Sequence, residues 1–283
     1  MPLQGIGYRF DPGTLHFSRP AGTDSAGRFA SADAADRPFF ARIMSLLWLH
    51  LEAIPDPGDS TSIGRDEARH AFGARRLGPG DIVTLFDGHG TVARARLTEE
   101  RTRSGDVVVE VVASERAPAL SPEVVIAFAV PKGDRLSTLL DGATQAGVTR
   151  LVPVECARSV VDAEKLDRGE RWQRILAEAT KVAKRAWMPE LVRGGPLLEV
   201  VAAEKARGAA VAVAHTADAV PFREWSGALD PAQPRVVCIG PEGGFDDAEV
   251  AGLRALGAGV VSLGPCVMRV EIAAIAAAVL ARG

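Results

Sequence analysis

Val124-Val-Ile-Ala-Phe-Ala-Val130 is a continuous apolar stretch. Such a run is expected of a strand that is buried on both faces of a parallel sheet, whereas a half-exposed strand alternates apolar and polar residues. A helical pattern follows at 134–146, and a second strand, Arg150-Leu-Val-Pro-Val154, comes directly after it. This order of strand, helix and strand predicts a parallel α/β domain.

The same alternation continues to the end of the chain. An amphipathic helical pattern runs from 170 to about 187, and strand-like runs follow at 209–213, 235–239 and 259–263. An Ala-rich helix is expected from about Glu271. We therefore predict one α/β domain over residues 119–283, and the general rules of chain connection favour an ordinary doubly wound sheet.

The residues before this domain have a different pattern. Short strand-like runs at 45–54, 81–86, 91–97 and 106–112 surround a helical stretch at 64–72. Phe86-Asp-Gly-His-Gly90 contains the Asp-Gly pair typical of a hairpin turn. These features predict a small β-barrel over residues 45–118. Residues 1–44 are expected to form a poorly ordered extension, because 1–36 are rich in Gly, Ser, Asp and Pro.

Composition narrows the class of protein. With 283 residues and 47% hydrophobic content, the chain has enough apolar surface for a large core, which excludes a wholly disordered protein. The balance of 33 Lys and Arg against 36 Asp and Glu excludes a uniformly basic coat, so RNA contacts would need local patches. The cysteines Cys156, Cys238 and Cys266 lack zinc-site spacing. We expect a cytoplasmic protein with reduced thiols, no metal and no membrane segment.

The segment after strand 235–239 is unusual. Gly240-Pro-Glu-Gly-Gly-Phe245 lies where open parallel sheets bind ligands, beyond the carboxyl end of a strand. Its spacing matches neither GxGxxG nor a P-loop, and its glutamate would repel phosphate. The loop therefore favours a neutral or cationic ligand. A sharp strand-to-helix turn that uses glycine only for its geometry remains the alternative.

A second loop, Leu263-Gly-Pro-Cys-Val-Met-Arg-Val-Glu271, follows the last strand. It turns at Gly-Pro and enters the terminal helix with Glu271 in the first turn. A glutamate there complements the helix dipole, so an ordinary helix start is the alternative to a ligand site.

Together, the two loops resemble the C-terminal motifs of the 16S ribosomal RNA uridine-N3 methyltransferases, which belong to the SPOUT class. The resemblance extends from about residue 66 to the end of the chain. Further matching segments are Arg76-Leu-Gly-Pro-Gly-Asp81, Leu85-Phe-Asp-Gly-His-Gly90, Lys132-Gly-Asp-Arg135, Gly147-Val-Thr-Arg150 and Arg171-Trp-Gln-Arg-Ile175.

The resemblance implies a PUA-like barrel that binds RNA, followed by a SPOUT-type α/β domain. A C-terminal trefoil knot in that domain would hold S-adenosyl-L-methionine in a bent form. It also implies a homodimer that acts on 16S ribosomal RNA or the small ribosomal subunit. Three alternatives stay open: a SPOUT enzyme for another RNA position, a non-catalytic RNA-binding relative, and a Rossmann-type nucleotide-binding protein, which lacks support from phosphate motifs.

The resemblance also assigns roles to individual residues. Arg269 would stabilise negative charge on the uracil oxygens, and Glu242 or Glu271 would remove the proton. Contacts with RNA phosphates are expected from Arg75, Arg76, Lys132, Arg135, Arg158 and Arg185. The donor would be bound by His215, Thr216, Ile239, Gly240, Pro241, Glu242, Gly243, Gly244, Leu263, Gly264, Val267 and Met268. A solvated loop is the alternative for the first two of these.

Two segments depart from the family pattern. The last loop reads Cys266-Val-Met-Arg-Val-Glu-Ile272 where the family commonly has Arg-Ile-Leu-Arg-x-Glu-Thr. Lys181-Val-Ala-Lys-Arg185 stands where an acidic-Gln-Ser stretch commonly precedes the arginine. Because these segments belong to the predicted catalytic domain, they keep a shifted RNA substrate open as an alternative.

Overall fold

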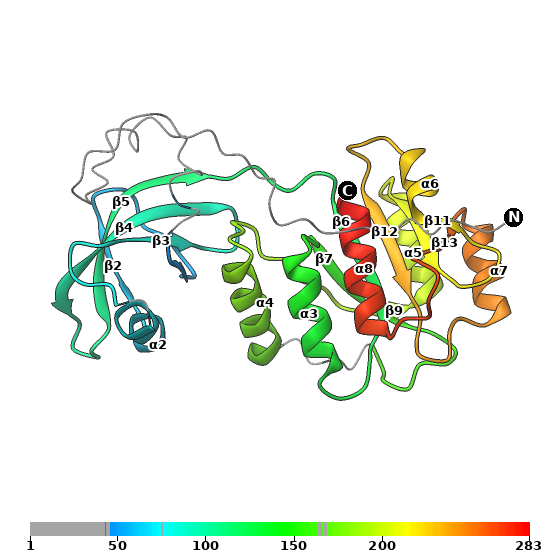
Figure 1. Cartoon of the computed structure of the whole chain (residues 1–283), viewed down its shortest axis with the longest axis horizontal. Coiled ribbons are helices and arrows are strands. Elements are labelled where there is room, and N and C mark those ends of the chain that lie inside the picture. The colour runs from blue at the N-terminus through cyan, green and yellow to red at the C-terminus, as the bar shows by residue number, and fades with distance from the viewer. Residues whose placement is uncertain (1–42, 44–45, 75, 164–165, 167–168) are drawn as a thin grey trace, which may run out of the picture. The chain divides into compact units, whose positions relative to one another are not determined.

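The computed structural model describes residues 43, 46–74, 76–163, 166 and 169–283, which contain two β-sheets (Figure 1). The extension predicted at 1–44 lies outside the described residues, apart from Ile43. Arg75, a predicted RNA contact, lies outside them as well.

The first sheet comes from the N-terminal part of the described chain. β1 pairs with β3 in parallel, and the remaining pairs are antiparallel. A short α-helix, α2 (Arg65–Arg69), continues into a π-helical turn, η1 (His70–Ala74). The order of the five strands is β1 (Trp48–His50), β3 (Ile82–Phe86), β4 (Thr91–Arg101), β5 (Val107–Arg116) and β2 (Ser60–Ile63).

The predicted hairpin turn between β3 and β4 is formed as its sequence indicates. The Asp87 carboxylate accepts hydrogen bonds from the backbone N–H groups of His89 at 2.7 Å and Thr91 at 2.9 Å. Gly90 has φ +103°, a backbone conformation that residues other than glycine rarely adopt. On β5, Val107, Val109 and alternate residues beyond them face the core of this sheet.

The second sheet is parallel throughout, as the apolar run at 124–130 predicts. All of the β6 side chains are buried, because helices cover both faces. β9 (Gly195–Pro196) also pairs with β7. The main path of the sheet runs β11 (Val220–Pro221), β13 (Gly259–Ser262), β10 (Ala210–Ala214), β12 (Arg235–Ile239), β6 (Val124–Ala129), β7 (Arg150–Glu155) and β8 (Glu190–Leu191).

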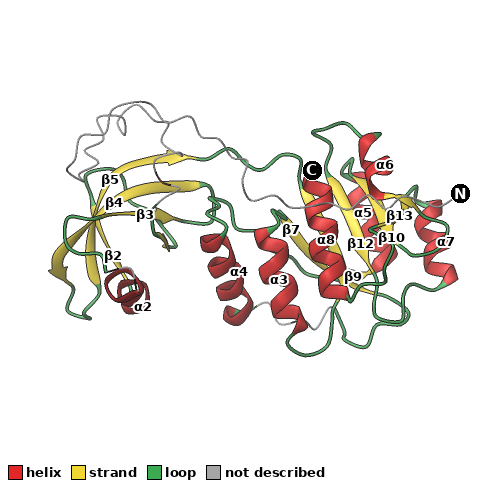
Figure 2. Ribbon diagram, in the orientation of Figure 1, coloured by secondary structure: helices red, strands yellow, loops and turns green. Residues whose placement is uncertain are grey.

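Helices cover the two faces of this sheet (Figure 2). One face carries α3 (Arg135–Gln145), α4 (Glu170–Val182), α6 (Phe222–Gly227) and α8 (Val270–Arg282). The other carries α5 (Leu197–Ala206) and α7 (Asp247–Ala255). Gly142 lets α3 and α8 approach closely, since a Cβ there would lie 2.3 Å from Cδ1 of Ile275. α8 is thereby packed against α3 and β6.

The structure differs from the sequence-based expectation at α4, which ends at Val182 instead of near 187. Lys184 has φ +51°, outside the helical region. The next residues pair with the hairpin turn instead: Gly90 N–H donates to Ala186 O at 3.0 Å, and Met188 N–H donates to Gly88 O at 2.9 Å. This tertiary pairing overrides the helical pattern of the local sequence.

The strand β2, the two-residue strands β8, β9 and β11, and the helices α5 and α6 have no counterpart in the sequence-based assignment. The trefoil knot stays a prediction. Within the described residues, every helix is too short or too polar to cross a bilayer. The same residues contain no cluster of His, Cys, Asp and Glu side chains suited to a metal ion.

Candidate active site

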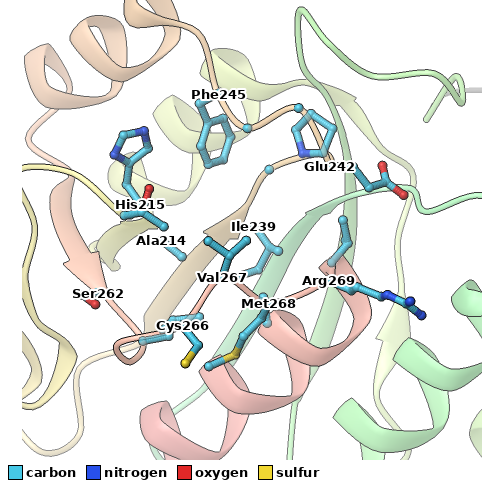
Figure 3. Close-up of a pocket in the computed structure, with 18 of the residues that line it drawn as sticks. Ala214, His215, Ile239, Glu242, Phe245, Ser262, Cys266, Val267, Met268 and Arg269 are labelled. Atoms are coloured by element: carbon cyan, nitrogen blue, oxygen red, sulfur yellow. The ribbon is translucent and has the colours of Figure 1, made fainter.

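A pocket of about 490 Å³ opens at the carboxyl ends of the neighbouring strands β13, β10 and β12 (Figure 3). Its walls come from the ends of these strands and the loops that follow them: residues 214–216 at β10, 239–245 at β12, and 262–264 and 266–270 at β13. Ala273 of α8 completes the lining. Because parallel strands end at the same edge of the sheet, three segments that are far apart in sequence form one site.

The glycine-rich loop after β12 has little room for side chains. Gly244 N–H donates to Pro241 O at 2.8 Å, and Gly244 has φ +71°. A Cβ on Gly240 would lie 3.0 Å from the ring of Phe245, which is itself buried. The loop therefore needs glycine both for its turn and for its packing, and it presents backbone groups to the pocket.

The outer side of this loop is fixed by the segment that follows β7. Nη1 of Arg158 donates to Gly243 O at 2.6 Å, and its aliphatic stem lies against Gly243. One carboxylate oxygen of Glu249 accepts the N–H of Ala157 at 2.7 Å, and the other accepts the N–H of Asp246 at 2.8 Å. The Asp246 carboxylate caps α7 in return. These bonds join the ends of two strands.

The loop after β13 turns back on itself before α8 begins. The Ser262 hydroxyl donates to Gly264 O at 2.9 Å. Arg269 takes the N-cap position of α8 in an extended conformation, and its side chain makes no capping hydrogen bond. Figure 3 shows the Arg269 side chain directed to the same side of the pocket as Glu242, away from Cys266 and Ser262. Its guanidinium is exposed and available to a ligand.

The segment after β10 forms the third wall. His215 N–H donates to Val261 O at 2.9 Å, which extends the pairing of β10 with β13. Nδ1 of His215 accepts the N–H of Ala217 at 3.1 Å. The same nitrogen lies 3.0 Å from Ala217 O, so the ring is held against this turn in either tautomer.

Glu242 stands at the mouth of the pocket and forms an ion pair with Arg135 of α3, at 2.8 Å between Oε1 and Nη1. The two side chains are 41% and 34% exposed, so water screens the attraction and the pair contributes little stability. Its effect is geometric, because it holds a carboxylate in one place beside the pocket.

Every residue predicted to bind the donor lines this pocket, and so does Arg269. Glu271, a predicted proton acceptor, does not line the pocket. It is 4% exposed, and its Oε2 has no hydrogen-bond partner among the described residues. Ala214, Phe245, Ser262, Cys266, Val270 and Ala273 also line the pocket without having been predicted to bind the donor. In the sequence, the only indication that these residues would line the pocket was that they lie next to or within the predicted loops.

The predicted RNA contacts fall into separate groups. Arg76 and Lys132 are exposed, whereas Arg135 and Arg158 hold the pocket loops as described above. Arg185 does not face open solvent. Its guanidinium donates to the carbonyl oxygen of Thr144 and, at 2.8 Å, to that of Val148, and both carbonyls lie at the C-terminal end of α3. Burial, and then the nearby Arg282, lowers the pKa of Arg185 to about 10. Its position is that of a helix-capping cation.

Comparison with known families supports the two-part organisation. The family described as RNA methyltransferase domain matches residues 119–282, and the RNA methyltransferase PUA domain matches residues 63–110. Together with the folds of the two sheets, these matches confirm a PUA-like domain followed by a SPOUT-type α/β domain.

Individual relatives agree with these families. Ribosomal RNA small subunit methyltransferase E of Mycobacterium bovis is 32% identical over 237 residues, which cover 82% of this chain and 89% of the relative. The enzyme of that name from Bacillus subtilis is 26% identical over 75% of this chain and 85% of the relative. The crystal structure of the Neisseria gonorrhoeae enzyme bound to S-adenosyl methionine superposes with a TM-score of 0.70 at 26% identity, over 82% of this chain and 95% of that one. The chain therefore belongs to the RNA methyltransferase family that includes the ribosomal RNA small subunit methyltransferases E.

Proposed function

We propose that this protein transfers a methyl group from S-adenosyl-L-methionine to N3 of a uridine in 16S ribosomal RNA. One observation carries the proposal: the two loops that resemble the donor-binding motifs of the family come together in a single pocket at the edge of the sheet. The Neisseria relative, whose fold is similar, was crystallised with S-adenosyl methionine bound.

The pocket suits the donor in size and chemistry. Its volume of about 490 Å³ lies within the range typical of small-molecule sites, about 300–1,000 Å³. Apolar side chains such as Ile239 and Met268 alternate with glycine backbone groups, which favours an adenine ring and its hydrogen-bonding edge. Glu242 is the one acidic side chain in the lining, and its charge is complementary to a sulfonium.

When bound, S-adenosylmethionine supplies an electrophilic methyl group on a positively charged sulfur. The protein must place the uracil N3 against that methyl group and accept the N3 proton. Arg269 is suited to donate hydrogen bonds to a uracil oxygen, where negative charge develops as the proton leaves. We assign the proton to the Glu242 carboxylate, because Glu242 lines the pocket while Glu271 is buried away from it. Arg135 orients that carboxylate.

For the RNA, we assign binding to the PUA-like domain at 45–118 and catalysis to 119–283. Arg76 and Lys132 are exposed and remain the candidates for phosphate contacts. Such contacts position the RNA, while the pocket selects the base. A substrate within the small ribosomal subunit places the protein in the cytoplasm.

We also infer a homodimer, because α8 has apolar residues on its outer side. Ile272, Val279 and Leu280 are 48%, 56% and 37% exposed. A helix that is apolar on all sides is normally buried. Val267, on the pocket loop that leads into α8, is 87% exposed. A second copy packed on α8 would cover this side chain and bring the partner subunit close to the donor pocket.

Two measurements test the proposed function. Calorimetry with S-adenosylmethionine on the folded chain should give one binding site per protomer, and no heat of binding would exclude the enzyme. Purified chain is then incubated with small subunits isolated from a strain that lacks the N3-methyluridine mark. Mass mapping of 16S RNA should show that mark restored. A methyl group on a different nucleotide would replace our assignment with another RNA position.

A further inference from the structure

A second cavity, of about 270 Å³, lies apart from the donor pocket, where the end of β5 meets the segment that follows α4. Apolar walls come from Trp48, Trp187, Leu120 and neighbouring alanines, and two cations, Lys184 and Arg185, complete the lining. None of the described lining residues is acidic. The cavity therefore combines aromatic surface with positive charge.

The walls of this cavity are held by specific bonds. Trp187 donates its indole N–H to Ala117 O at 3.1 Å, and Trp48 donates its own to Ile43 O at 3.2 Å. Gly90 allows the Trp187 ring to pack directly on the hairpin turn, since a Cβ there would lie 2.4 Å from that ring. Trp48 is 3% exposed, so Trp187 and Leu120 provide most of the accessible apolar surface. The cavity is preformed.

The charged side chains described at the cavity are all positive. The guanidinium of Arg116 lies 5.0 Å from the centre of the Trp187 ring, which adds a third cation at the rim. Behind Arg185 stand Arg282 and Arg235, and the Nε atoms of all three are buried without a hydrogen-bond partner among the described residues. No described carboxylate forms an ion pair with these three arginines. These guanidiniums donate instead to backbone carbonyls such as Val148 O, Ala281 O and Pro122 O, so an anion in the cavity would meet chiefly Lys184 and Arg116.

We propose that this cavity binds one nucleotide of single-stranded RNA, with the base against the tryptophan and Leu120 surface and the phosphate beside Lys184. Aromatic side chains bind unpaired bases by stacking, and Lys or Arg at the rim binds the backbone. The cavity is smaller than most drug-sized sites, so it admits a single nucleotide and excludes a duplex. The choice of RNA as the source of the nucleotide rests on the proposed function. The chemistry of base and phosphate rests on the cavity alone.

Lys184 lies within the segment in which this chain departs from the family pattern, so its contribution to the subsite is particular to this chain. The subsite would hold a nucleotide away from the target uridine, because the cavity lies beside the amino ends of β6 and β7, whereas the donor pocket opens at the carboxyl ends of the strands. It would thus contribute to the choice of RNA without touching the reacting atoms.

The test uses the full chain without donor and a fluorescein-labelled hexaribonucleotide of mixed sequence. Leu120 is 37% exposed at the cavity, and Leu198 on α5 is 38% exposed away from it. Leu120→Asp should weaken RNA binding about tenfold, because it places a negative charge in the apolar surface beside the base, whereas Leu198→Asp should change it less than about twofold. Equal affinities for the two variants, both folded by thermal melting, would overturn the proposal.

The phosphate contact has its own test. Lys184→Glu should reduce the slope of log affinity against log salt by at least about 0.7, the value for one phosphate on a single strand. Arg254→Glu, on the exposed side of α7, is the matched control and should leave the slope unchanged. An unchanged slope for Lys184→Glu would remove Lys184 from the site.

Two further experiments distinguish RNA from a free mononucleotide as the ligand, and the nucleotide subsite from the proposed methyl transfer. Adenosine and uridine 5′-monophosphates are titrated as competitors. Release of the oligonucleotide at micromolar mononucleotide would assign the cavity to a free nucleotide and overturn the RNA assignment. Calorimetry with S-adenosylmethionine on Leu120→Asp should match that of the unaltered chain. The unaltered chain and Leu120→Asp could both fail to bind the donor while Leu120→Asp still binds the oligonucleotide more weakly. In that case the proposed methyl transfer fails and the nucleotide subsite stands.

Discussion

Nη1 of Arg158 lies 2.6 Å from the carbonyl oxygen of Gly243, and this bond ties the end of β7 to the glycine-rich loop after β12. The sequence predicts that Arg158 contacts RNA. In the structure it lies behind the donor pocket and positions one of its loops.

Removing this bond should weaken donor binding. Arg158→Ala leaves the Gly243 carbonyl without its charged donor and frees the loop to move. Because hydrogen bonds to charged groups contribute about 1.5–3 kcal/mol, the dissociation constant for S-adenosylmethionine should rise about tenfold or more by calorimetry. Arg158→Lys should recover part of the loss, and Arg254→Ala on α7 serves as the control. A dissociation constant unaffected by Arg158→Ala would show that the loop holds itself.

Substitution of Arg269 should separate binding from turnover. The guanidinium lies at the mouth of the pocket without a capping role, so Arg269→Ala should leave the donor dissociation constant within about twofold. Single-turnover methyl transfer to small subunits should slow by about a hundredfold or more, as when a donor to a developing negative charge is lost. An unchanged rate would show that Arg269 does not touch the uracil.

The outer face of α8 gives a prediction about assembly. Val279 is 56% exposed on α8, and Val220 is 42% exposed on β11. Val279→Asp would place a charge in the proposed dimer interface, so light scattering on a sizing column should show a monomer. Val220→Asp should remain a dimer. A monomeric unaltered chain at micromolar concentration would contradict the inferred homodimer.

The three cysteines should differ in reactivity. Burial, followed by the negative charge of Glu249, raises the pKa of Cys156 to about 12, and burial also raises the pKa of Cys238. Cys266 is exposed in the donor pocket. Maleimide near neutral pH should therefore label Cys266 alone in the native protein, because the thiolate is the reactive form. Saturating S-adenosylmethionine should slow this labelling. Peptide mass analysis checks the site, and rapid labelling of Cys156 would contradict its burial.

His50 should make stability depend on pH. Burial, and next the nearby Lys181, lowers the pKa of His50 below its usual value. The unfolded chain then binds more protons than the folded one as pH falls below about 6.5, so this contribution is complete above that pH and declines below it. The urea midpoint should fall between about pH 7 and pH 5, and His50→Gln should lessen the fall. His89→Gln, in the exposed hairpin turn, should leave it unchanged. An identical fall in all three proteins would show that His50 contributes nothing.

The main features of the fold follow from local sequence patterns. The apolar run at 124–130 indicates a doubly covered strand, and Asp87-Gly88 indicates a tight turn, because each pattern acts over a few residues. The end of α4 could not be predicted in this way. Residues up to about 187 have helical periodicity, but the backbone at 186–188 is paired with the hairpin turn, which lies far away in sequence.

The site shows the same division. Each donor loop alone was compatible with an ordinary turn or helix start, and the spacing and order of the two loops made them recognisable as a donor site. The roles of Arg135 and Arg158 depend on which loop each side chain reaches, and nothing near them in sequence specifies those partners. Glu271 looked like a helix-start residue or a base from sequence, and only the packing of α8 reveals that it is buried.

The position of β12 between β10 and β6 has a consequence for synthesis of the protein. β6 gains its second neighbour only after residues 235–239 have left the ribosome, and α8, which packs on both strands, follows β12 in the chain. The five-stranded sheet needs only residues 48–116, so it is free to fold early, while the parallel sheet waits for β12 and α8. A nascent chain would therefore begin to bind methyl donor only after the pocket residues up to Ala273 have left the ribosome.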